Sequence, residues 1–272
     1  MRWRRLGVVV GLGLVGLIGV RPPSCEAVNS RLLNGTTDLI NFGRAAAVDD
    51  LGPLTGCAWI KPAGLGGGGF GRILAKENTG ANGAWNFFVN TNNSLKFSKD
   101  FATTDLDRTS GNNAISLSGT WQHVCVTWDG TATTSGVVLY AGGTALSSTG
   151  TTGVGTEVSD AALNVIVGNR QNAGRAFNGN LAYVQIFSRV LSASEIQQIM
   201  LQPESVTSGL VFYATLQGVS PETDDSTTAL SGTLTGTTVD TGDGPTLQEP
   251  ATCLSGWTQP RTWLRLAQGR LR

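Results

Sequence analysis

LAYVQIFSRVLSASEIQQIM, the stretch from Leu181 to Met200, decides the fold class of this chain. Its first part, Leu181–Phe187, is rich in β-branched and aromatic residues and predicts a strand. A capping box follows, in which the Ser192 hydroxyl accepts a hydrogen bond from the Glu195 amide and the Glu195 carboxylate accepts one from the amide of the cap residue. An apolar stripe on one side continues from there until Pro203. The pattern predicts one short helix directly after a strand.

Ten further runs of β-branched and aromatic residues are separated by clusters of Gly, Asn, Ser and Thr. They predict strands at Thr37–Phe42, Leu54–Ile60, Arg72–Lys76, Ala84–Val89, Ser94–Ser98, Asn113–Leu117, Trp121–Trp128, Gly136–Ala141, Asn164–Val167 and Leu210–Ala214. Both alternating faces of Trp121–Trp128 are largely apolar, which indicates a central strand. One short helix after so many strands predicts an all-β fold, a two-sheet antiparallel jelly-roll sandwich with the helix after the last core strand.

Length and composition set the class of protein. The chain has 272 residues with 37 Gly and 9 Pro, a share below the roughly 25% that marks low-complexity chains, so one folded domain with tails is expected. Its 19 Lys and Arg balance its 19 Asp and Glu. This balance excludes the surplus of positive charge that nucleic-acid binding requires, and no nucleic-acid partner is expected.

A basic start and an uncharged run mark residues 1–27 as a secretory signal peptide. The uncharged run, Leu6–Val20, is shorter than the ~18–20 residues of a bilayer-spanning helix. We expect cleavage after Ala27, and retention as an uncleaved N-terminal anchor is the alternative. The mature protein is then secreted or displayed at the cell surface, with no membrane span.

Three cysteines remain after Cys25 leaves with the signal peptide. Cys57 and Cys125 lie in strand-like segments, and Cys253 lies near the C-terminus. Two buried thiols at Cys57 and Cys125 are the favoured interpretation, because free cysteine is among the most buried residue types. A disulfide between them is the alternative.

Four stretches together resemble the laminin-G-like domains of the concanavalin A-like jelly-roll superfamily. They are Cys57–Lys61, Gly119–Gly130, Val138–Tyr140 with Gly142-Gly143, and Phe177–Ile196. The last stretch is the most specific, because a strand followed by an Arg-x-Leu-Ser-x-x-Glu-Ile helix start seldom arises in random β-rich sequence. The resemblance implies that residues 28–202 form a jelly-roll binding domain.

Residues 203–250 resemble a segment that commonly opens such domains and here closes one. Leu210–Leu216, Asp224-Asp225-Ser226 and Gly232–Gly236 carry this likeness. We expect the segment to add edge strands to the same domain, because the termini of a sandwich lie near each other. The start of a truncated second repeat is the alternative. Residues 251–272 contain four Arg and no acidic residue and are predicted to be a flexible basic tail.

The resemblance also suggests calcium. Such domains often carry an acidic residue after the Gly-x-Leu of the last stretch, where it can help to bind calcium, and this chain has Ala182 there. The candidate calcium ligands are then Asn178 and Asn180, through their amide oxygens, and Asp224 and Asp225 beside a rim loop. Turn formation by the Asn residues and turn capping by the Asp residues are the favoured alternatives. No other cofactor is expected.

Catalytic groups are sparse in the predicted strands. A glycosidase on this fold needs paired carboxylates about 5–10 Å apart across one face, and no predicted strand carries acids at i, i+2 or i+4. Glu77 stands at a strand end, Asp105-Leu106-Asp107 is favoured as a solvated turn, and His123 is favoured as a packed core residue. We therefore predict a protein that is not an enzyme, with a degenerate glucanase as a minor alternative.

Ligand contacts are expected in long loops rich in Gly, Asn and Thr. These rim loops are Gly64–Gly71, Glu77–Gly83, Phe101–Asn112, Thr144–Ala161 and Gly168–Gly179. Trp85 is a candidate platform on which a sugar stacks, and Arg170 and Arg175 are candidate hydrogen-bond donors to the same carbohydrate. A core position for Trp85 and plain surface positions for the arginines are the alternatives.

The leading hypothesis is a secreted, non-catalytic laminin-G-like module. It would bind a glycan or an extracellular protein surface through rim loops, with the assistance of calcium. The alternative is a structural or adhesion component of a cell-envelope or virion assembly.

Overall fold

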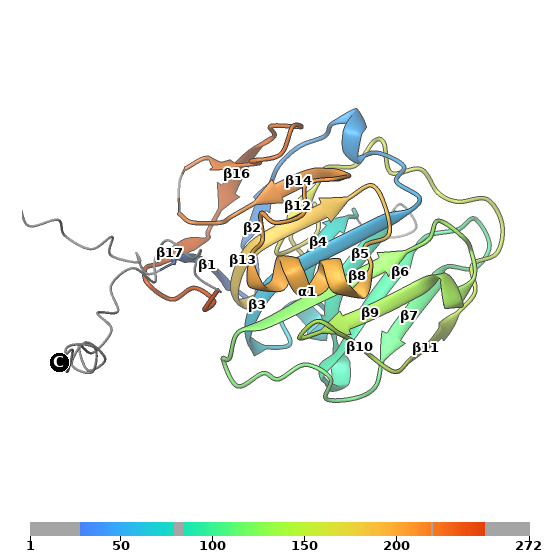
Figure 1. Ribbon diagram of the computed structural model, residues 1–272, viewed down its shortest axis with the longest axis horizontal. Coiled ribbons are helices and arrows are strands. Elements are labelled where there is room, and N and C mark those ends of the chain that lie inside the picture. The colour runs from blue at the N-terminus through green and yellow to red at the C-terminus, as the bar shows by residue number, and fades with distance from the viewer. Residues whose placement is uncertain (1–27, 79–83, 219, 248–272) are drawn as a thin grey trace, which may run out of the picture. The chain divides into compact units, whose positions relative to one another are not determined.

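The computed structural model describes residues 28–78, 84–218 and 220–247, and most of their regular secondary structure lies in two antiparallel sheets (Figure 1). The predicted signal peptide (1–27) and basic tail (251–272), with Cys25 and Cys253, lie outside the described residues. Within the described part of the chain, no helix has the length and apolar character needed to span a membrane.

The first sheet has eight strands. Its order is β10 (Thr144–Ala145), β9 (Val137–Ala141), β8 (Gln122–Trp128), β3 (Leu54–Gly64), β13 (Asn178–Phe187), β1 (Ser30–Asn34) and β17 (Thr238–Asp240), with β14 (Leu210–Ala214) also paired to β13. The central position predicted for the Trp121–Trp128 segment is confirmed, because β8 pairs with β3 on one side and β9 on the other.

The second sheet has nine strands. Its order is β11 (Ser148–Thr151), β7 (Leu106–Ser110), β6 (Ser94–Lys99), β5 (Trp85–Asn90), β4 (Gly71–Lys76), β12 (Ile166–Val167), β2 (Leu39–Asn41), β16 (Ser231–Thr235) and β15 (Glu222–Thr223). Short 3-10 turns occur at η1 (Ala46–Val48), η2 (Gly67–Gly69), η4 (Thr91–Asn93) and η5 (Thr134–Gly136). The predicted all-β class and two-sheet jelly-roll architecture are confirmed.

The core lies between the two sheets because the strands alternate in burial. Phe87 of β5 and Phe97 of β6 are fully buried on the inner face of the second sheet. The Phe97 ring lies 6.3 Å, centroid to centroid, from the ring of Trp128 on β8, so the two sheets meet there. The Trp128 indole N–H donates to the Thr131 carbonyl at 2.7 Å. Burial of each such large side chain contributes roughly 2–3 kcal/mol.

One strand prediction is wrong. Asn113–Leu117 is a loop: Asn113 has φ +57°, and the Ile115 amide donates to the Asn93 carbonyl rather than to a neighbouring strand. The strand of this region is instead β7, which contains Asp107 and Arg108 and lay in a predicted rim loop. Polar residues form this strand because β7 lies near the edge of the second sheet, between β6 and β11, where only its end residues are buried.

The C-terminal segment contributes strands to both sheets. β14 pairs with the second half of β13, β16 pairs with β2, and β17 pairs with β1. β17 is the outermost strand at its end of the first sheet, and β16 joins only β15 beyond it in the second. Chain from beyond residue 203 therefore completes the sheets that the preceding residues build.

A single α-helix, α1 (Ala193–Leu201), lies against the outer face of the first sheet (Figure 1). The predicted capping box is present: the Glu195 amide donates to the Ser192 hydroxyl at 3.3 Å, and the Ser192 amide donates to the Glu195 carboxylate at 2.8 Å. Ile196 and Ile199 are buried on the sheet side. They pack in one cluster with Cys57, Cys125 and Tyr140 of the sheet.

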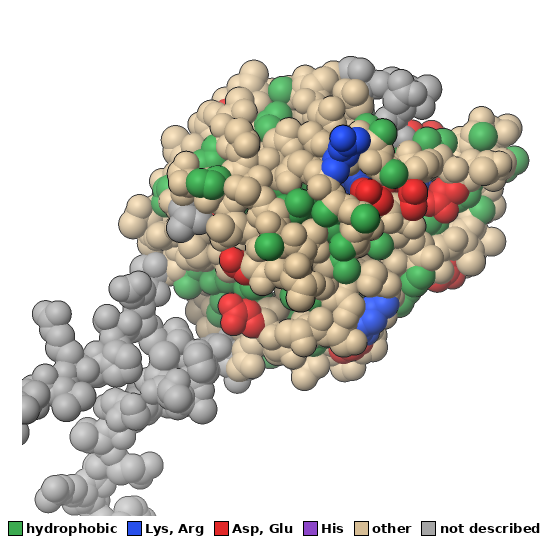
Figure 2. Space-filling model, turned by 90° about the horizontal axis from the view of Figure 1, so that it is seen from above, with side chains coloured by type: hydrophobic (Ala, Val, Ile, Leu, Met, Phe, Trp, Pro, Cys, Tyr) green, Lys and Arg blue, Asp and Glu red, His purple; other side chains and the backbone are tan. Residues whose placement is uncertain are grey.

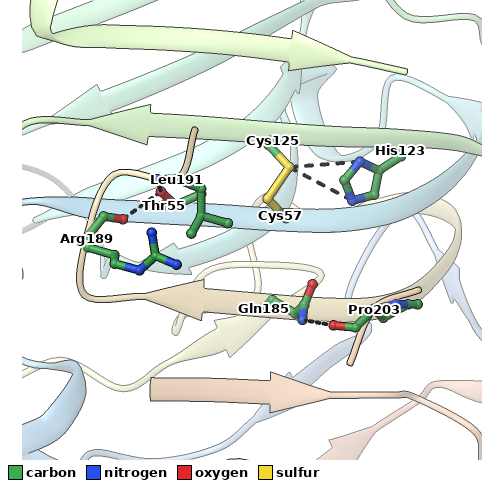
Figure 3. Close-up of a disulfide and its surroundings, with 8 residues drawn as sticks. All are labelled: Thr55, Cys57, His123, Cys125, Gln185, Arg189, Leu191 and Pro203. Carbon is green, nitrogen blue, oxygen red and sulfur yellow. Dashed lines mark hydrogen bonds between the residues drawn. A yellow bond between two sulfur atoms is a disulfide. The ribbon is translucent and has the colours of Figure 1, made fainter. Parts of the chain in front are cut away.

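The prediction of two free buried thiols is wrong, because Cys57 and Cys125 form a disulfide (Figure 3). The β3–β8 register sets the two residues directly opposite each other, with their Cα atoms 4.1 Å apart. His123 lies on the same face with its ring nitrogens 3.9 Å from the Cys125 sulfur. Burial lowers the pKa of His123 to about 3, so its imidazole is a neutral, packed ring.

Candidate functional site

The two outer faces of the sandwich differ. The helix covers part of the first sheet's outer face, whereas the outer face of the second sheet carries an open pocket of about 340 Å³. The pocket is lined by Phe70, Arg72, Glu77, Asn86, Phe88, Lys96, Ser98, Asp100, Asp105, Arg170 and Arg175. Figure 2 shows another feature of the surface: on the face it presents, uncharged polar groups predominate and charged side chains gather in a few places. The pocket brings together seven charged residues, more than half of its lining.

Strand register builds the floor of the pocket. Arg72 of β4 lies opposite Phe88 of β5, and Phe88 lies opposite Lys96 of β6. In the next outward-facing row, Asn86 of β5 lies opposite Ser98 of β6. Side chains directly opposite in an antiparallel pair point to the same face, so these five residues share one surface.

Arg72 is fixed from two sides. Its Nε and a terminal nitrogen donate to the two carboxylate oxygens of Glu77 at 2.6 and 2.9 Å. Its guanidinium carbon lies 4.1 Å from the centroid of the Phe88 ring. A bidentate ion pair combined with stacking on an aromatic ring holds a guanidinium in one orientation.

The β12–β13 loop brings Arg170 and Arg175 to the pocket, and Asn169 organises that loop. The Asn169 side-chain oxygen accepts the backbone N–H groups of Arg170 at 2.9 Å and Arg175 at 2.8 Å. Its amide nitrogen donates to the Asp38 carbonyl at 3.0 Å. Asn169 is fully buried, and this one side chain therefore sets where both arginines leave the loop.

The glycine run at residues 66–69 leaves room for Arg175. A Cβ on Gly68, whose φ is +62°, would lie 2.2 Å from a terminal nitrogen of Arg175. The guanidinium instead lies over the Phe70 ring, 4.6 Å from its centroid. The predicted rim loops Gly64–Gly71 and Gly168–Gly179 thus meet at this pocket.

Acidic side chains form the other end of the pocket. Burial, followed by the charges of Asp105 and Glu77, raises the pKa of Asp100 to about 6. Asp105 is held by its neighbour, since its carboxylate accepts the Phe101 amide at 3.1 Å. We considered acids at i, i+2 or i+4 within one predicted strand, and these pocket acids do not have that spacing within a strand. The acids of this pocket come from loops and strand ends rather than from one strand. A search for acids at alternate positions of a single strand does not detect such an arrangement.

Two polar atoms at the pocket have no hydrogen-bond partner among the described residues. They are the side-chain oxygen of Asn86 and the Nε of Arg170. Asn86 is 6% exposed, and buried polar atoms are nearly always hydrogen-bonded in folded proteins. An unpaired acceptor and an unpaired donor in one hollow indicate a site that a polar ligand completes.

Comparison with known proteins places the chain in a family. A laminin-G family model, described as the concanavalin A-like lectin/glucanases superfamily, matches residues 34–197. The chain belongs to this family. A search of curated proteins gave no match.

Several solved structures are similar to this laminin-G-like chain, and the first of them shares its fold. A candidate carbohydrate binding protein from Bacteroides ovatus has a TM-score of 0.62 at 17% sequence identity over 82% of this chain, and the chain spans 62% of that protein's length. A SAP-like pentraxin from Limulus polyphemus has a TM-score of 0.47 at 15% identity, with 80% and 90% of the two chains covered. Domains LG4-5 of the mouse laminin α1 chain have a TM-score of 0.45 at 14% identity, with 68% and 48% covered. At these identities the likeness concerns the fold.

The structure separates the three carbohydrate candidates of this laminin-G-like chain. Arg170 and Arg175 line the pocket together. Trp85 does not, because its side chain is fully buried in the core on the inner face of β5. The prediction of Trp85 as a stacking platform is therefore wrong. Phe87 and Phe88 are neighbours on β5 and both are apolar. The sequence therefore did not reveal whether the odd-numbered or the even-numbered residues of this strand face outward.

The Asp224 carboxylate is used by the backbone of its own turn. It accepts N–H groups from Tyr213 at 2.9 Å, Ser226 at 3.0 Å and Leu230 at 3.2 Å. Asp225 is exposed and accepts the Thr223 hydroxyl at 3.0 Å. Turn capping, the alternative role for these residues, accounts for the Asp224 contacts with Ser226 and Leu230 and for the Asp225 contact with Thr223, whereas Tyr213 lies on β14.

Asn178 and Asn180 lie on β13, away from that turn in the chain. The Asn180 amide donates to the Ser30 hydroxyl at 3.0 Å and to the Asp240 carboxylate at 2.9 Å. Asn178 packs over Gly64, where an added Cβ would lie 2.6 Å from its amide nitrogen. Calcium binding at these positions or at Asp224 and Asp225 stays a prediction.

Among the described residues, one group of three His, Cys or acidic side chains has its potential ligand atoms within 4.8 Å of one another. It consists of Cys57, His123 and Cys125, and the two sulfurs are joined in the disulfide. Metal ions are bound by thiolates rather than by disulfide sulfurs. In this oxidised form the group is structural.

Proposed function

We propose that this laminin-G-like chain is a binding module that takes carbohydrate into the pocket on the outer face of its second sheet. The observation that carries the proposal is that Asn86 and Arg170 line one pocket, and that the Asn86 side-chain oxygen and the Arg170 Nε have no hydrogen-bond partner among the described residues. The hydroxyl groups of a saccharide can donate to the Asn86 oxygen, and its oxygen atoms can accept from the Arg170 Nε. The family itself includes lectins, which bind sugars without transforming them.

An extracellular location fits the same proposal. The Cys57–Cys125 disulfide favours an oxidising compartment, where such bonds persist. The basic and apolar start of the chain was interpreted above as a secretory signal peptide. We therefore propose secretion or surface display, with a glycan or a glycan-bearing protein as the partner.

A glycan array tests the proposal. The full chain, expressed with its disulfide intact, is applied to the array with calcium and again with a chelator. Saturable binding to a defined group of glycans supports the module. Loss of binding with the chelator supports calcium assistance, and unchanged binding removes calcium from the proposal.

The array also tests the assembly alternative. A protein that binds no glycan and is recovered in large particles would contradict the carbohydrate proposal. That result would favour a structural component of a cell envelope or virion.

Glycoside hydrolysis is a second candidate function, and Asp100 is the observation that favours it. Burial and the charge of Asp105 raise the pKa of Asp100 to about 6, and two acidic side chains in one pocket resemble the acid and base pair of glycosidases. Release of reducing sugar from array-selected glycans, abolished by Asp100→Asn, would support hydrolysis. Binding without release would leave the module as proposed.

A further inference from the structure

The part of the pocket lining around Glu77 has more positive than negative charge. Three guanidinium groups, from Arg72, Arg170 and Arg175, are arranged near the single carboxylate of Glu77. Arg72 donates hydrogen bonds to both oxygens of the Glu77 carboxylate, at 2.6 and 2.9 Å. Arg170 approaches the same carboxylate only to 3.7 Å. One negative charge is therefore shared by three positive ones.

Arg175 has the weakest compensation of the three. Its guanidinium makes a long hydrogen bond of 3.5 Å to the Gly67 carbonyl and lies over the Phe70 ring. Burial, followed by the positive charges of Arg170 and Arg72, lowers the pKa of Arg175, and Glu77 alone acts in the opposite sense. In the part of the chain that the structure describes, the Arg175 guanidinium is thus held in place without an ion pair to a carboxylate of its own.

The other two acids of the lining are Asp100 and Asp105. Among the described residues, the ion pairs of the pocket arginines are made with Glu77 and not with either of these two acids. Lys96, the remaining cation of the lining, is paired with Asp107 at 2.9 Å. The three guanidinium groups therefore depend on one carboxylate, that of Glu77.

This inference rests on the proposed carbohydrate function. We propose that the saccharide is acidic, and that a carboxylate or sulfate group on it binds the guanidinium groups of Arg170 and Arg175. The paired N–H donors of a guanidinium match the oxygens of either anion. The uncharged hydroxyls of the same sugar then donate to Asn86 and to the carboxyl groups of Asp100 and Asp105.

The test compares matched acidic and neutral sugars on the full chain. Uronic-acid and O-sulfated glycans on an array are paired with their neutral counterparts, and affinities of binding pairs are measured by calorimetry. We expect the acidic member to bind at least about tenfold more tightly, because a charge-assisted hydrogen bond is stronger than one between neutral groups. The preference should shrink as salt screens the charges.

Two variants locate the effect. Arg170→Gln combined with Arg175→Gln should remove the preference and leave acidic and neutral sugars with about equal affinity. Arg44→Gln, which removes an exposed arginine outside the pocket lining, should keep the preference of the natural protein. An unchanged circular dichroism spectrum and melting temperature establish that both variants are folded.

The outcomes separate this inference from the proposed function. Equal affinity for acidic and neutral sugars in the natural protein would overturn the inference and leave carbohydrate binding intact. Survival of the acidic preference in the double arginine variant would also overturn it. Failure to bind any glycan on the array would overturn the proposed function itself.

Discussion

Asp100 is the residue through which pH acts most directly on the pocket. Its ordinary pKa of 3.8 is raised to about 6, first by burial and then by the carboxylates of Asp105 and Glu77. The charge of Lys99 lowers the pKa of Asp100, and the charge of Asp107 raises it. The folded protein therefore holds this proton more tightly than the unfolded chain does. It follows that the Asp100 contribution to the free energy of unfolding falls as pH rises from about 4 to about 6.

Asp100→Asn removes this penalty. Because the variant side chain stays neutral, we expect it to unfold with a free energy about 1 kcal/mol higher than the natural protein at pH 7, a value reduced to allow for partial solvent screening. The difference should vanish near pH 4, where the natural carboxyl group is protonated. Urea denaturation of both proteins at several pH values measures it. A difference that stays constant across this range would contradict the assignment.

Asn169 is the residue that positions both pocket arginines. Asn169→Ala leaves the backbone N–H groups of Arg170 and Arg175 without their acceptor and should cost about 2 kcal/mol of stability. It should also weaken binding of acidic sugars more than binding of neutral ones, which a loss of stability alone would not do. Asn172→Ala, at an exposed position in the same loop, is the matched control. Calorimetric titration of acidic and neutral sugars into both variants shows whether Asn169 positions the arginines or only stabilises the fold.

The elements were largely predictable because their sequence signals are local. The capping box at Ser192 and the apolar alternation in β8 each occur within a few residues, and both predictions are confirmed. β7 was not predictable in the same way, because Asp107 and Arg108 belong to a polar strand near a sheet edge. Its pairing with β6 and β11 depends on contacts distant in sequence.

The site was less predictable than the fold for the same reason. Arg170 and Arg175 were candidates because they lie in a glycine-rich loop, and the structure places both in the pocket lining. Arg72, Asn86 and Phe88 lie inside correctly predicted strands, and which side of a strand faces outward depends on register. In β5 both sides contain aromatic residues, so the sequence alone did not distinguish the core from the pocket.

Helix α1 has a testable dependence on its cap. Ser192→Ala removes the acceptor of the Glu195 amide and should lower the free energy of unfolding by about 1 kcal/mol. Gln198→Ala, at an exposed position in the same helix, should be close to neutral. Both are measured by chemical denaturation. Because α1 covers the first sheet and the pocket lies on the second, sugar binding by Ser192→Ala should be unchanged, and a large loss of affinity would contradict this separation of faces.

At the scale of the whole molecule, the disulfide joins two central strands of the first sheet across 68 residues of sequence. Replacing Cys57 and Cys125 together by Ala should lower the free energy of unfolding by about 3–4 kcal/mol, because the unfolded chain regains the freedom of a long loop. Denaturation with and without a thiol reductant measures the effect. The natural protein should respond to the reductant and the double variant should not. Equal stability of the oxidised natural protein and the variant would contradict a structural role for the bond.

The helix lies on the outer face of one sheet and the pocket on the outer face of the other. This arrangement leads to the most direct test of ligand binding in the pocket. Ser98→Trp fills the pocket with an indole from its floor on β6, whereas Thr149→Trp adds the same side chain at an exposed position of β11. A saccharide selected on the array is titrated into both folded variants by calorimetry. We predict that Thr149→Trp binds with the affinity of the natural protein and that Ser98→Trp gives no binding heat. Undiminished binding by Ser98→Trp would contradict the claim that this pocket is where the protein holds its ligand.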